Sequence, residues 1–260
     1  MDSVSLSLVI PLYNEEDNVL PLVEQLNAAL AGWSGPLEIL LVDDGSTDRP
    51  LGLLRRAQEA DPRVRIIHFR RNLGQTAAMA AGFSLAKGWA VVTLDGDLQN
   101  DPAEIPRLVE MLKDWDAVCG IRIRREDGPW KRLSSRIGNG FRNWLTGDNI
   151  VDTGCTLKAY RGDCLRGLDL YHGMHRFLPT LVKMRGYRVT QVPVRHRPRL
   201  HGTTKYATWG RLVKGLGDVL AVRWMKKNRI DLDSAMEVLE SRSQEPEARS
   251  QKLEAKREEC

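Results

Sequence analysis

Short apolar runs alternate with stripes of apolar residues at helical spacing, and this alternation limits the fold more than any other feature of the chain. Residues 5–12 and 37–42 are continuous apolar stretches, which predict buried strands, and a helical stripe from Glu15 to Leu30 separates them. Further strands are expected at 63–69, 89–94, 116–121 and 187–194, and further helices at 76–86, 102–114, 131–145 and 172–185. The pattern predicts an α/β fold with a mostly parallel sheet covered by helices on both faces, in which ligands bind where the strands end.

The composition is that of a globular protein. Hydrophobic residues make up 42% of the 260 residues, which argues against a disordered chain. The four cysteines show no C-x-x-C spacing, so we expect reduced thiols in a cytosolic protein rather than a zinc knuckle or a disulfide framework. No basic leader precedes the first strand, and no stretch approaches the roughly 20 apolar residues of a membrane-spanning helix, so we expect neither a signal peptide nor a transmembrane segment.

The positive charge is unevenly placed. The formal net charge is +5, yet residues 231–260 carry nine acidic and five basic side chains. Basic residues concentrate at 122–142 and 195–229, where we expect an anionic partner.

The pattern changes from Ala207 to Asn228, where apolar residues that include Trp209 and Trp224 recur at helical spacing among Lys and Arg. One interpretation is a terminal helix that packs on the core. The other is an amphipathic helix in the membrane interface, with its cations facing anionic lipid. The domain organisation we expect is therefore an α/β domain at 1–206, an interfacial helix at 207–229 and a charged, partly disordered or helical tail at 230–260.

Acidic and polar residues follow the first two predicted strands. IPLYNEE ends the first strand and offers a rigid turn, an aromatic face and carboxylates, which suit a nucleoside, although an ordinary helix start explains Asn14 to Glu16 equally well. The glycines of a dinucleotide site or a P-loop are absent there. VDDGSTD ends the second strand, and turn chemistry accounts for Gly45 to Asp48. It does not account for two adjacent acids, Asp43 and Asp44, whose repulsion needs a compensating partner.

The segment TLDGDLQNDP after the fourth predicted strand is the most informative. Asp95 and Asp97 flank a glycine, and Gln99 adds a neutral oxygen two residues later. Hard oxygen ligands in an open loop suit Mg²⁺ or Mn²⁺ shared with substrate phosphates. An EF-hand loop is excluded because Asn100 and Pro106 stand where it needs Gly and Glu. A polar turn before a helix that begins at Pro102 remains an alternative.

Two basic clusters follow. The first includes Arg122, Arg136 and Arg142, and the second is VRHRPRLHGTTKY, with Arg199 and Lys205. Most of these residues are expected on a solvated face, but the planar fork of arginine also pairs well with phosphate oxygens. The five histidines show no metal-ligand spacing.

Taken together, six ordered motifs resemble family-2 glycosyltransferases, and more narrowly the dolichyl-phosphate mannose synthase branch with its bacterial polyprenyl-phosphate sugar transferases. The motifs are IPLYNEE, VDDGSTD, RRNLGQTAAMAAG, LDGDLQNDP, CGIR…SSRIGN and RLHGTTKY. The resemblance covers roughly residues 5–229. It implies the GT-A fold, a Rossmann-like nucleotide-diphospho-sugar transferase architecture.

By position, the resemblance also implies roles for individual residues. Those assigned to the donor nucleotide are Pro11, Tyr13, Glu15, Val42 and Asp44. The donor diphosphate is assigned Asp95, Gly96 and Asp97, with Asp97 and Gln99 as the best metal ligands and Asp95 close by. The cations that meet the reacting phosphates are Arg122 and Arg136, with Arg199 and Lys205 on a loop that closes over the site and Arg176 as a looser match.

The implied reaction is metal-dependent, inverting transfer of a sugar, mannose or a related hexose, from a nucleotide-diphosphate sugar to a polyprenyl phosphate. A phosphate acceptor is already anionic at neutral pH and needs no general base. We expect the enzyme at the cytoplasmic face of a membrane. The alternative is a family-2 enzyme that glycosylates a sugar hydroxyl, which needs a carboxylate base, and Asp152 stays a candidate for it.

A protein that binds nucleic acid is not expected, because no motif of that class occurs. The sequence leaves open the sugar, the base, the lipid length, and whether the tail binds a membrane-protein partner or another copy of the chain.

Overall fold

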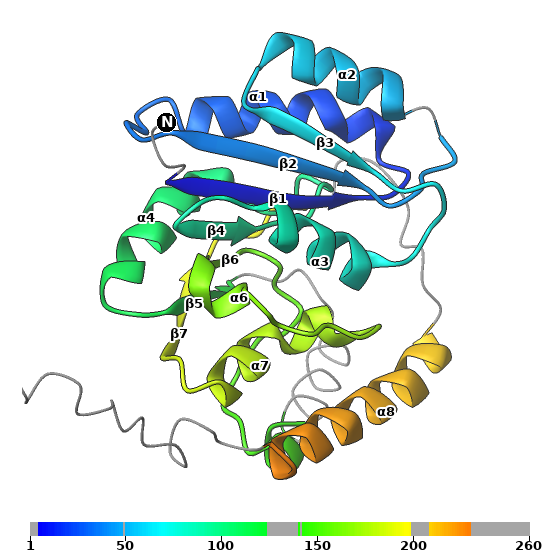
Figure 1. Cartoon of the computed structure of the whole chain (residues 1–260), viewed down its shortest axis with the longest axis vertical. Coiled ribbons are helices and arrows are strands. Elements are labelled where there is room, and N and C mark those ends of the chain that lie inside the picture. The colour runs from blue at the N-terminus through cyan, green and yellow to red at the C-terminus, as the bar shows by residue number, and fades with distance from the viewer. Residues whose placement is uncertain (1–4, 49, 124–139, 141, 199–207, 230–260) are drawn as a thin grey trace, which may run out of the picture. The chain divides into compact units, whose positions relative to one another are not determined.

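The computed structural model describes residues 5–48, 50–123, 140, 142–198 and 208–229. These residues form a seven-stranded sheet in the order β3-β2-β1-β4-β6-β5-β7 (Figure 1). The strands are β1 (Leu6–Leu12), β2 (Leu37–Asp43), β3 (Val64–His68), β4 (Ala90–Thr93), β5 (Ala117–Arg122), β6 (Lys158–Arg161) and β7 (Val189–Val194). The helices are α1 (Val19–Ala29), α2 (Pro50–Ala60), α3 (Gln75–Leu85), α4 (Ile105–Glu110), α6 (Gly162–Leu165), α7 (Leu178–Met184) and α8 (Thr208–Lys227).

The sheet is mostly parallel. β1 pairs in parallel with β2 and β4, β2 with β3, and β5 with β7, while β6 runs antiparallel between β4 and β5. The carboxyl ends of all the strands except β6 therefore lie at one edge, and β6 begins at that edge. The mostly parallel sheet was predicted from the sequence; β6 was not, because its four residues, KAYR, show neither alternation nor an apolar run.

Helices cover both faces of the sheet, as predicted (Figure 1). Alternate residues of β1 show how: Leu8 and Ile10 belong to a core cluster that includes residues of α1, α2 and α4, whereas Val9 belongs to a second cluster with residues of α3 and α7. Because β1 is buried on both sides, its sequence is almost continuously apolar.

Two of the predicted helices are found in pieces that are shorter than expected. The helix expected at 102–114 is α4 flanked by two 3₁₀ turns, and the one expected at 172–185 is the 3₁₀ turn Met174–Phe177 followed by α7. Most of the helix expected at 131–145 lies outside the described residues, and 142–146 is helical.

The described part of α8 has two different faces. Val219 and Val222 pack against Met174, Phe177 and Leu181, as the core-packing interpretation expects. On another face of the helix three side chains are about half exposed or more: Leu216, Leu220 and Trp224.

Met1–Lys226 forms one compact unit and Lys227–Cys260 a second, and the domain boundaries at 206 and 229 stay predictions. Among the described helices, none combines the length and apolar character needed to cross a membrane.

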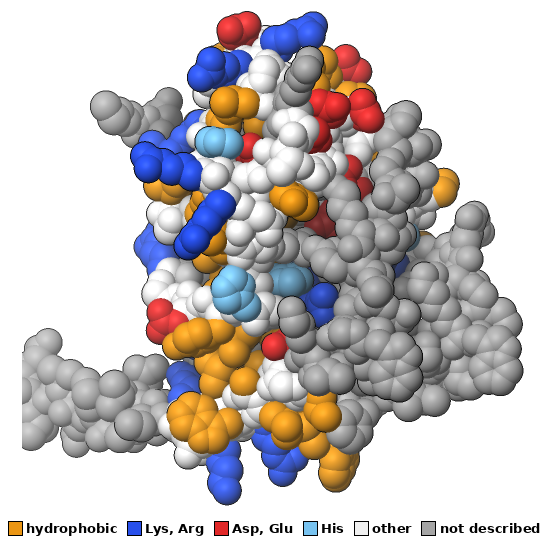
Figure 2. Space-filling model, turned by 90° about the vertical axis from the view of Figure 1, so that its right-hand side faces the viewer, with side chains coloured by type: hydrophobic (Ala, Val, Ile, Leu, Met, Phe, Trp, Pro, Cys, Tyr) orange, Lys and Arg blue, Asp and Glu red, His pale blue; other side chains and the backbone are white. Residues whose placement is uncertain are grey.

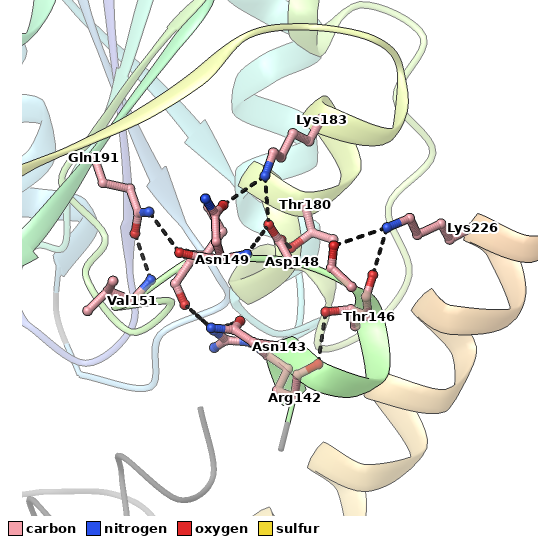
Figure 3. A network of polar contacts seen from close by, with 12 residues as sticks. Arg142, Asn143, Thr146, Asp148, Asn149, Val151, Thr180, Lys183, Gln191 and Lys226 are labelled. Carbon is pink, nitrogen blue, oxygen red and sulfur yellow. Dashed lines mark hydrogen bonds and ion pairs between the residues drawn. The ribbon is translucent and has the colours of Figure 1, made fainter. Parts of the chain in front are cut away.

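A polar network fixes the stretch 142–151 to two neighbouring helices, α7 and α8 (Figure 3). Asp148 accepts a hydrogen bond from Thr180 and pairs with Lys183, both on α7, and Lys226 of α8 donates to the main-chain oxygen of Thr146 at 2.9 Å. Arg142 is only 6% exposed and donates to the main-chain oxygen of Ile150. Arg142 is therefore an exception to the expectation that most of the first basic cluster lies on a solvated face, and its guanidinium bonds to a loop carbonyl inside the protein.

Candidate active site

Loops that follow β1 and β2 are joined to each other by hydrogen bonds. Asn14, with φ of 51°, donates its main-chain N–H to Ser46 Oγ at 2.9 Å and accepts from the main-chain N–H of Thr47 at 2.8 Å. The main-chain N–H of Glu16 donates to Asp48 at 3.1 Å. These bonds fix the backbone around Tyr13 and Glu15, two of the residues assigned to the nucleotide, and both are partly exposed.

The adjacent acids at the end of β2 each have their own partners. Asp43 is fully buried and accepts from Ser46 Oγ at 2.6 Å, and its other oxygen lies 2.7 Å from His68 Nδ1. Asp44 accepts from the main-chain N–H groups of Leu73 and Gly74 at 2.7 and 2.9 Å. Burial and the charge of Asp43 raise the pKa of Asp44, although these N–H bonds act in the opposite direction. These partners compensate the repulsion between the two adjacent acids that the sequence indicated. Asp44 therefore holds the 72–74 loop in place, and it is also a candidate nucleotide ligand.

Two other residues assigned to the donor are packed inside the protein. The side chain of Val42 is fully buried, so only its main chain can face a ligand. At Gly96 an added Cβ would lie 2.2 Å from Cδ2 of Leu12, at the end of β1. Gly96 therefore lets the acidic loop after β4 approach β1, where Pro11 is partly exposed.

The two acids after β4 have different surroundings. Gln75, at the start of α3, donates to Asp95 Oδ1 at 2.8 Å, and the main-chain N–H of Asp95 donates to Asn100. Asp97 is 6% exposed and accepts from the main-chain N–H of Gln99 at 3.1 Å. Burial and the charge of Asp97 together raise the pKa of Asp95 to about 6, so the acids are close enough to repel each other.

This raised pKa gives a stability prediction for the metal-free protein. Between the ordinary value of 3.8 and about 6, the folded state binds a proton at Asp95 more tightly than the unfolded chain does. As the pH rises through that window, the contribution of Asp95 to the free energy of unfolding therefore falls by on the order of 2–3 kcal/mol. Asp95→Asn is expected to unfold at higher urea than the parent at pH 7 in EDTA, and the difference is expected to vanish near pH 4. A parent that is the more stable of the two at pH 7 would contradict the assignment.

The donor set of this loop fits a divalent cation that a substrate completes. Asp97 and Asp95 supply carboxylates, and Gln99 directs its amide nitrogen toward the carbonyl of Arg197 at 3.4 Å. Over the described residues, no group of three or more His, Cys, Asp or Glu could hold a metal without help. Mg²⁺ and Mn²⁺ are commonly held by one or two carboxylates plus substrate phosphates, so this small set suits them.

Arg122, at the end of β5, forms a two-pronged ion pair with Asp152. Its Nε and Nη2 each lie 2.8 Å from an oxygen of Asp152, and the side chains are 16% and 8% exposed. Burial alone lowers the pKa of Arg122, but the hydrogen bonds and charge of Asp152 outweigh it and raise the value. The charge of Arg122 also acts on Asp95, so β5 and β4 contribute to one site across the start of β6. Asp152, the candidate base, is thus already ion-paired with an arginine.

Segment 173–176 lies against the start of α3. His175 Nδ1 is 2.7 Å from Thr76 Oγ1, next to the Gln75 that holds Asp95. Burial and the nearby charges of Arg176 and Lys158 lower the pKa of His175 to about 3, so this imidazole is neutral. Arg176, assigned to the acceptor phosphate, is partly exposed and close enough to act on His175.

Three of the assigned cations lie outside the described residues: Arg136, Arg199 and Lys205. The segment that leads to two of them is in contact with the acidic loop. The main-chain N–H of Arg197 donates to the oxygen of Gln99 at 2.8 Å, and Arg197 also pairs with Asp101 at 2.7 Å.

Sequence reasoning missed Lys158, a buried lysine on β6 that acts electrostatically on Asp95 and His175. The available signal was a single charge within TLKAY, and it could be interpreted only once that stretch was known to be a strand.

Comparison with known proteins agrees with this geometry. Residues 7–168 match the family model described as Glycosyl transferase family 2. The chain is 39% identical over 233 residues to a dodecaprenyl-phosphate galacturonate synthase of Rhizobium johnstonii, covering 87% of this chain and 69% of that protein. It is 43% identical over 202 residues to an undecaprenyl-phosphate 4-deoxy-4-formamido-L-arabinose transferase of Edwardsiella ictaluri, covering 77% and 62%. The second match spans less than two thirds of that relative's length.

Solved structures share the fold at low sequence identity. A glucosyl-3-phosphoglycerate synthase from Mycobacterium tuberculosis, in complex with Mn²⁺, UDP and glucosyl-3-phosphoglycerate, aligns with a TM-score of 0.63 at 18% identity, covering 88% of this chain and 81% of that one. A mannosyltransferase from Pyrobaculum calidifontis, in complex with GDP-Man and Mn²⁺, aligns with a TM-score of 0.58 at 21% identity, covering 87% and 64%. The predicted GT-A fold is confirmed.

The family model, the relatives and the acidic loop at the sheet edge agree: the chain belongs to glycosyl transferase family 2 and is a glycosyltransferase of the GT-A fold.

Proposed function

We propose that the enzyme transfers a sugar from a nucleotide-diphosphate sugar to a polyprenyl phosphate, with inversion at the anomeric carbon. An oxygen of the lipid phosphate attacks that carbon while its bond to the diphosphate breaks, and the nucleoside diphosphate leaves. The relatives named above, whose names specify dodecaprenyl or undecaprenyl phosphate, support this class of acceptor.

The observation that carries the proposal is the pairing of Asp152 with Arg122. Transfer to a sugar hydroxyl needs a carboxylate that can take up a proton. In the described part of 140–160 the two acids are Asp148 and Asp152, and both are ion-paired. A phosphate acceptor carries about −1.5 to −2 charge and needs no base, so it suits a site whose carboxylates hold cations.

Two anionic reactants must approach each other in this site. The residues that would hold the donor diphosphate with a divalent ion are Asp97 and Gln99, with Asp95 close by, and the ion would neutralise the leaving diphosphate. Arg122 is oriented by Asp152 toward the same edge, and Arg136, Arg176, Arg199 and Lys205 are the proposed partners of the phosphates. Tyr13, Glu15 and the loop after β2 are the proposed nucleoside side of the site.

The proposal includes attachment to the cytoplasmic surface of a membrane, because the acceptor is a lipid. The exposed face of α8 carries Leu216, Leu220 and Trp224 at intervals of four residues. Trp144, which belongs to the helical turn 142–146 next to α8, is 73% exposed. Figure 2 shows hydrophobic side chains gathered with Lys and Arg at the end where α8 lies. Apolar side chains among cations are typical of a surface that enters the headgroup region.

Leu220→Asp is expected to weaken binding to anionic phospholipid vesicles about tenfold, because it removes a leucine from the apolar stripe and adds a negative charge. Vesicle co-sedimentation measures it. Leu85→Asp is the matched control, since Leu85 is a 43% exposed leucine of α3, outside α8, and its replacement is expected to change nothing. Equal weakening by both variants would contradict the role of α8.

The function is tested by incubating the enzyme with radiolabelled nucleotide sugars, Mn²⁺ and undecaprenyl phosphate. A panel of UDP- and GDP-sugars, including a uronic acid and a pentose derivative, is expected to give a labelled, organic-soluble product with at least one donor. EDTA is expected to abolish it. Label that stays in the aqueous phase with every donor would overturn the proposal.

A further inference from the structure

The side chain of Lys158 is among the largest that the described fold buries completely, with 1% exposed. It begins β6, the antiparallel strand between β4 and β5, and lies opposite Thr93 on one side and Cys119 on the other. A lysine in the middle of a sheet requires an explanation, because burying an ammonium group without a charged partner is costly.

Sheet geometry directs this lysine to the acidic loop. Side chains opposite each other in an antiparallel pair lie on the same face, and so do side chains two residues apart. Lys158 therefore shares a face with Thr93, the last residue of β4, and Asp95 follows Thr93 by two residues in the loop that begins there. Consistent with this, the charge of Lys158 acts on both Asp95 and His175.

Within the described residues, no ion pair of 4 Å or less and no side-chain hydrogen bond involves Lys158. The acid that follows the end of β4, Asp95, is bonded to Gln75. The buried lysine thus acts on the acidic loop through space, by its charge on Asp95.

We infer that Lys158 is a positioning residue of the donor site, an interior positive charge that offsets the charge of Asp95 and Asp97 and so allows an anionic diphosphate to approach them. The inference rests on the proposed use of this loop for a diphosphate and a divalent cation. An interior cation of this kind opposes a bound metal ion and favours a bound diphosphate, so its removal has effects of opposite sign on the two ligands.

The test uses Lys158→Met, which keeps the length of the side chain and removes its charge, at pH 8. Mn²⁺ binding is measured by electron paramagnetic resonance without nucleotide, and UDP binding by calorimetry in EDTA, with GDP as a second arm. The expected result is Mn²⁺ binding about tenfold tighter and nucleoside diphosphate binding about tenfold weaker than in the parent, from the loss of one charge that acts on this loop. Lys158→Arg, which restores the charge, is expected to return both affinities toward the parent values.

Tyr160→Phe is the matched control, because Tyr160 is fully buried two residues along the same strand and on the same face. It is expected to leave both affinities unchanged. If Lys158→Met weakens both ligands together, the lysine has a structural role alone, and if it changes neither, the loop does not sense its charge; either result overturns the inference. Lys158→Gln gives the same comparison should the methionine variant not fold. These binding measurements need no acceptor lipid, so their result is independent of the transfer assay. The inference about Lys158 can fail while sugar transfer is observed, and it can hold while no transfer is observed.

Discussion

Replacing Asp97 with asparagine is expected to lower the rate of sugar transfer by about 10³-fold while the protein stays folded. Stabilisation of the leaving diphosphate by a metal ion amounts to several kcal/mol, and each 1.36 kcal/mol corresponds to a factor of ten in rate. Asparagine keeps the oxygen that accepts the main-chain N–H of Gln99, so the loop is expected to keep its conformation. Initial rates at saturating Mn²⁺, with thermal unfolding measured in parallel, check the result.

Asp114→Asn is the matched control for this variant. Asp114 is exposed and precedes β5, so it lies at the edge of the sheet away from the acidic loop. Its replacement is expected to leave the rate unchanged. Full activity in Asp97→Asn would contradict the metal assignment.

Replacing Asp152 with alanine is expected to destabilise the fold by about 3–5 kcal/mol. The variant leaves the guanidinium of Arg122 largely buried without its carboxylate, and breaking a buried ion pair has a cost of this size. Chemical denaturation measures the change. Asp163→Ala is the control, because its ion pair with Arg166 is exposed and such pairs contribute little.

A double variant tests whether Arg122 acts in transfer. The double change Arg122→Met with Asp152→Leu is expected to recover much of the stability lost in Asp152→Ala, because apolar residues can replace a buried ion pair, yet to remain inactive. Recovered activity in the double variant would exclude a role for Arg122 in transfer.

The sequence was sufficient for the parts of the fold that depend on periodicity. The continuous apolar runs of β1 and β2 and the stripe of α1 follow directly from burial on both faces of a parallel sheet. It was insufficient for β6, whose four residues are held by pairing with β4 and β5 rather than by local preference.

The site divides in the same way. Asp95 and Asp97 could be located because a strand followed by acids in an open loop has a chemical meaning of its own. The partners of those acids could not, since Gln75, Arg122 and Lys158 come from distant positions and are brought together by the order of the strands. Arg142 shows the reverse: a cation that resembles surface charge in the sequence is a buried structural residue. The adjacent acids after β2 were noted as needing partners, but only the fold identifies His68 and the 72–74 loop.

Sugar transfer is compared between two acceptors that differ only in their terminal group, undecaprenyl phosphate and undecaprenol, with the same labelled donor and Mn²⁺. Transfer to the phosphate alone is expected, with inversion at the anomeric carbon of the product. Transfer to the free alcohol, or to a sugar hydroxyl in preference to the lipid phosphate, would contradict it.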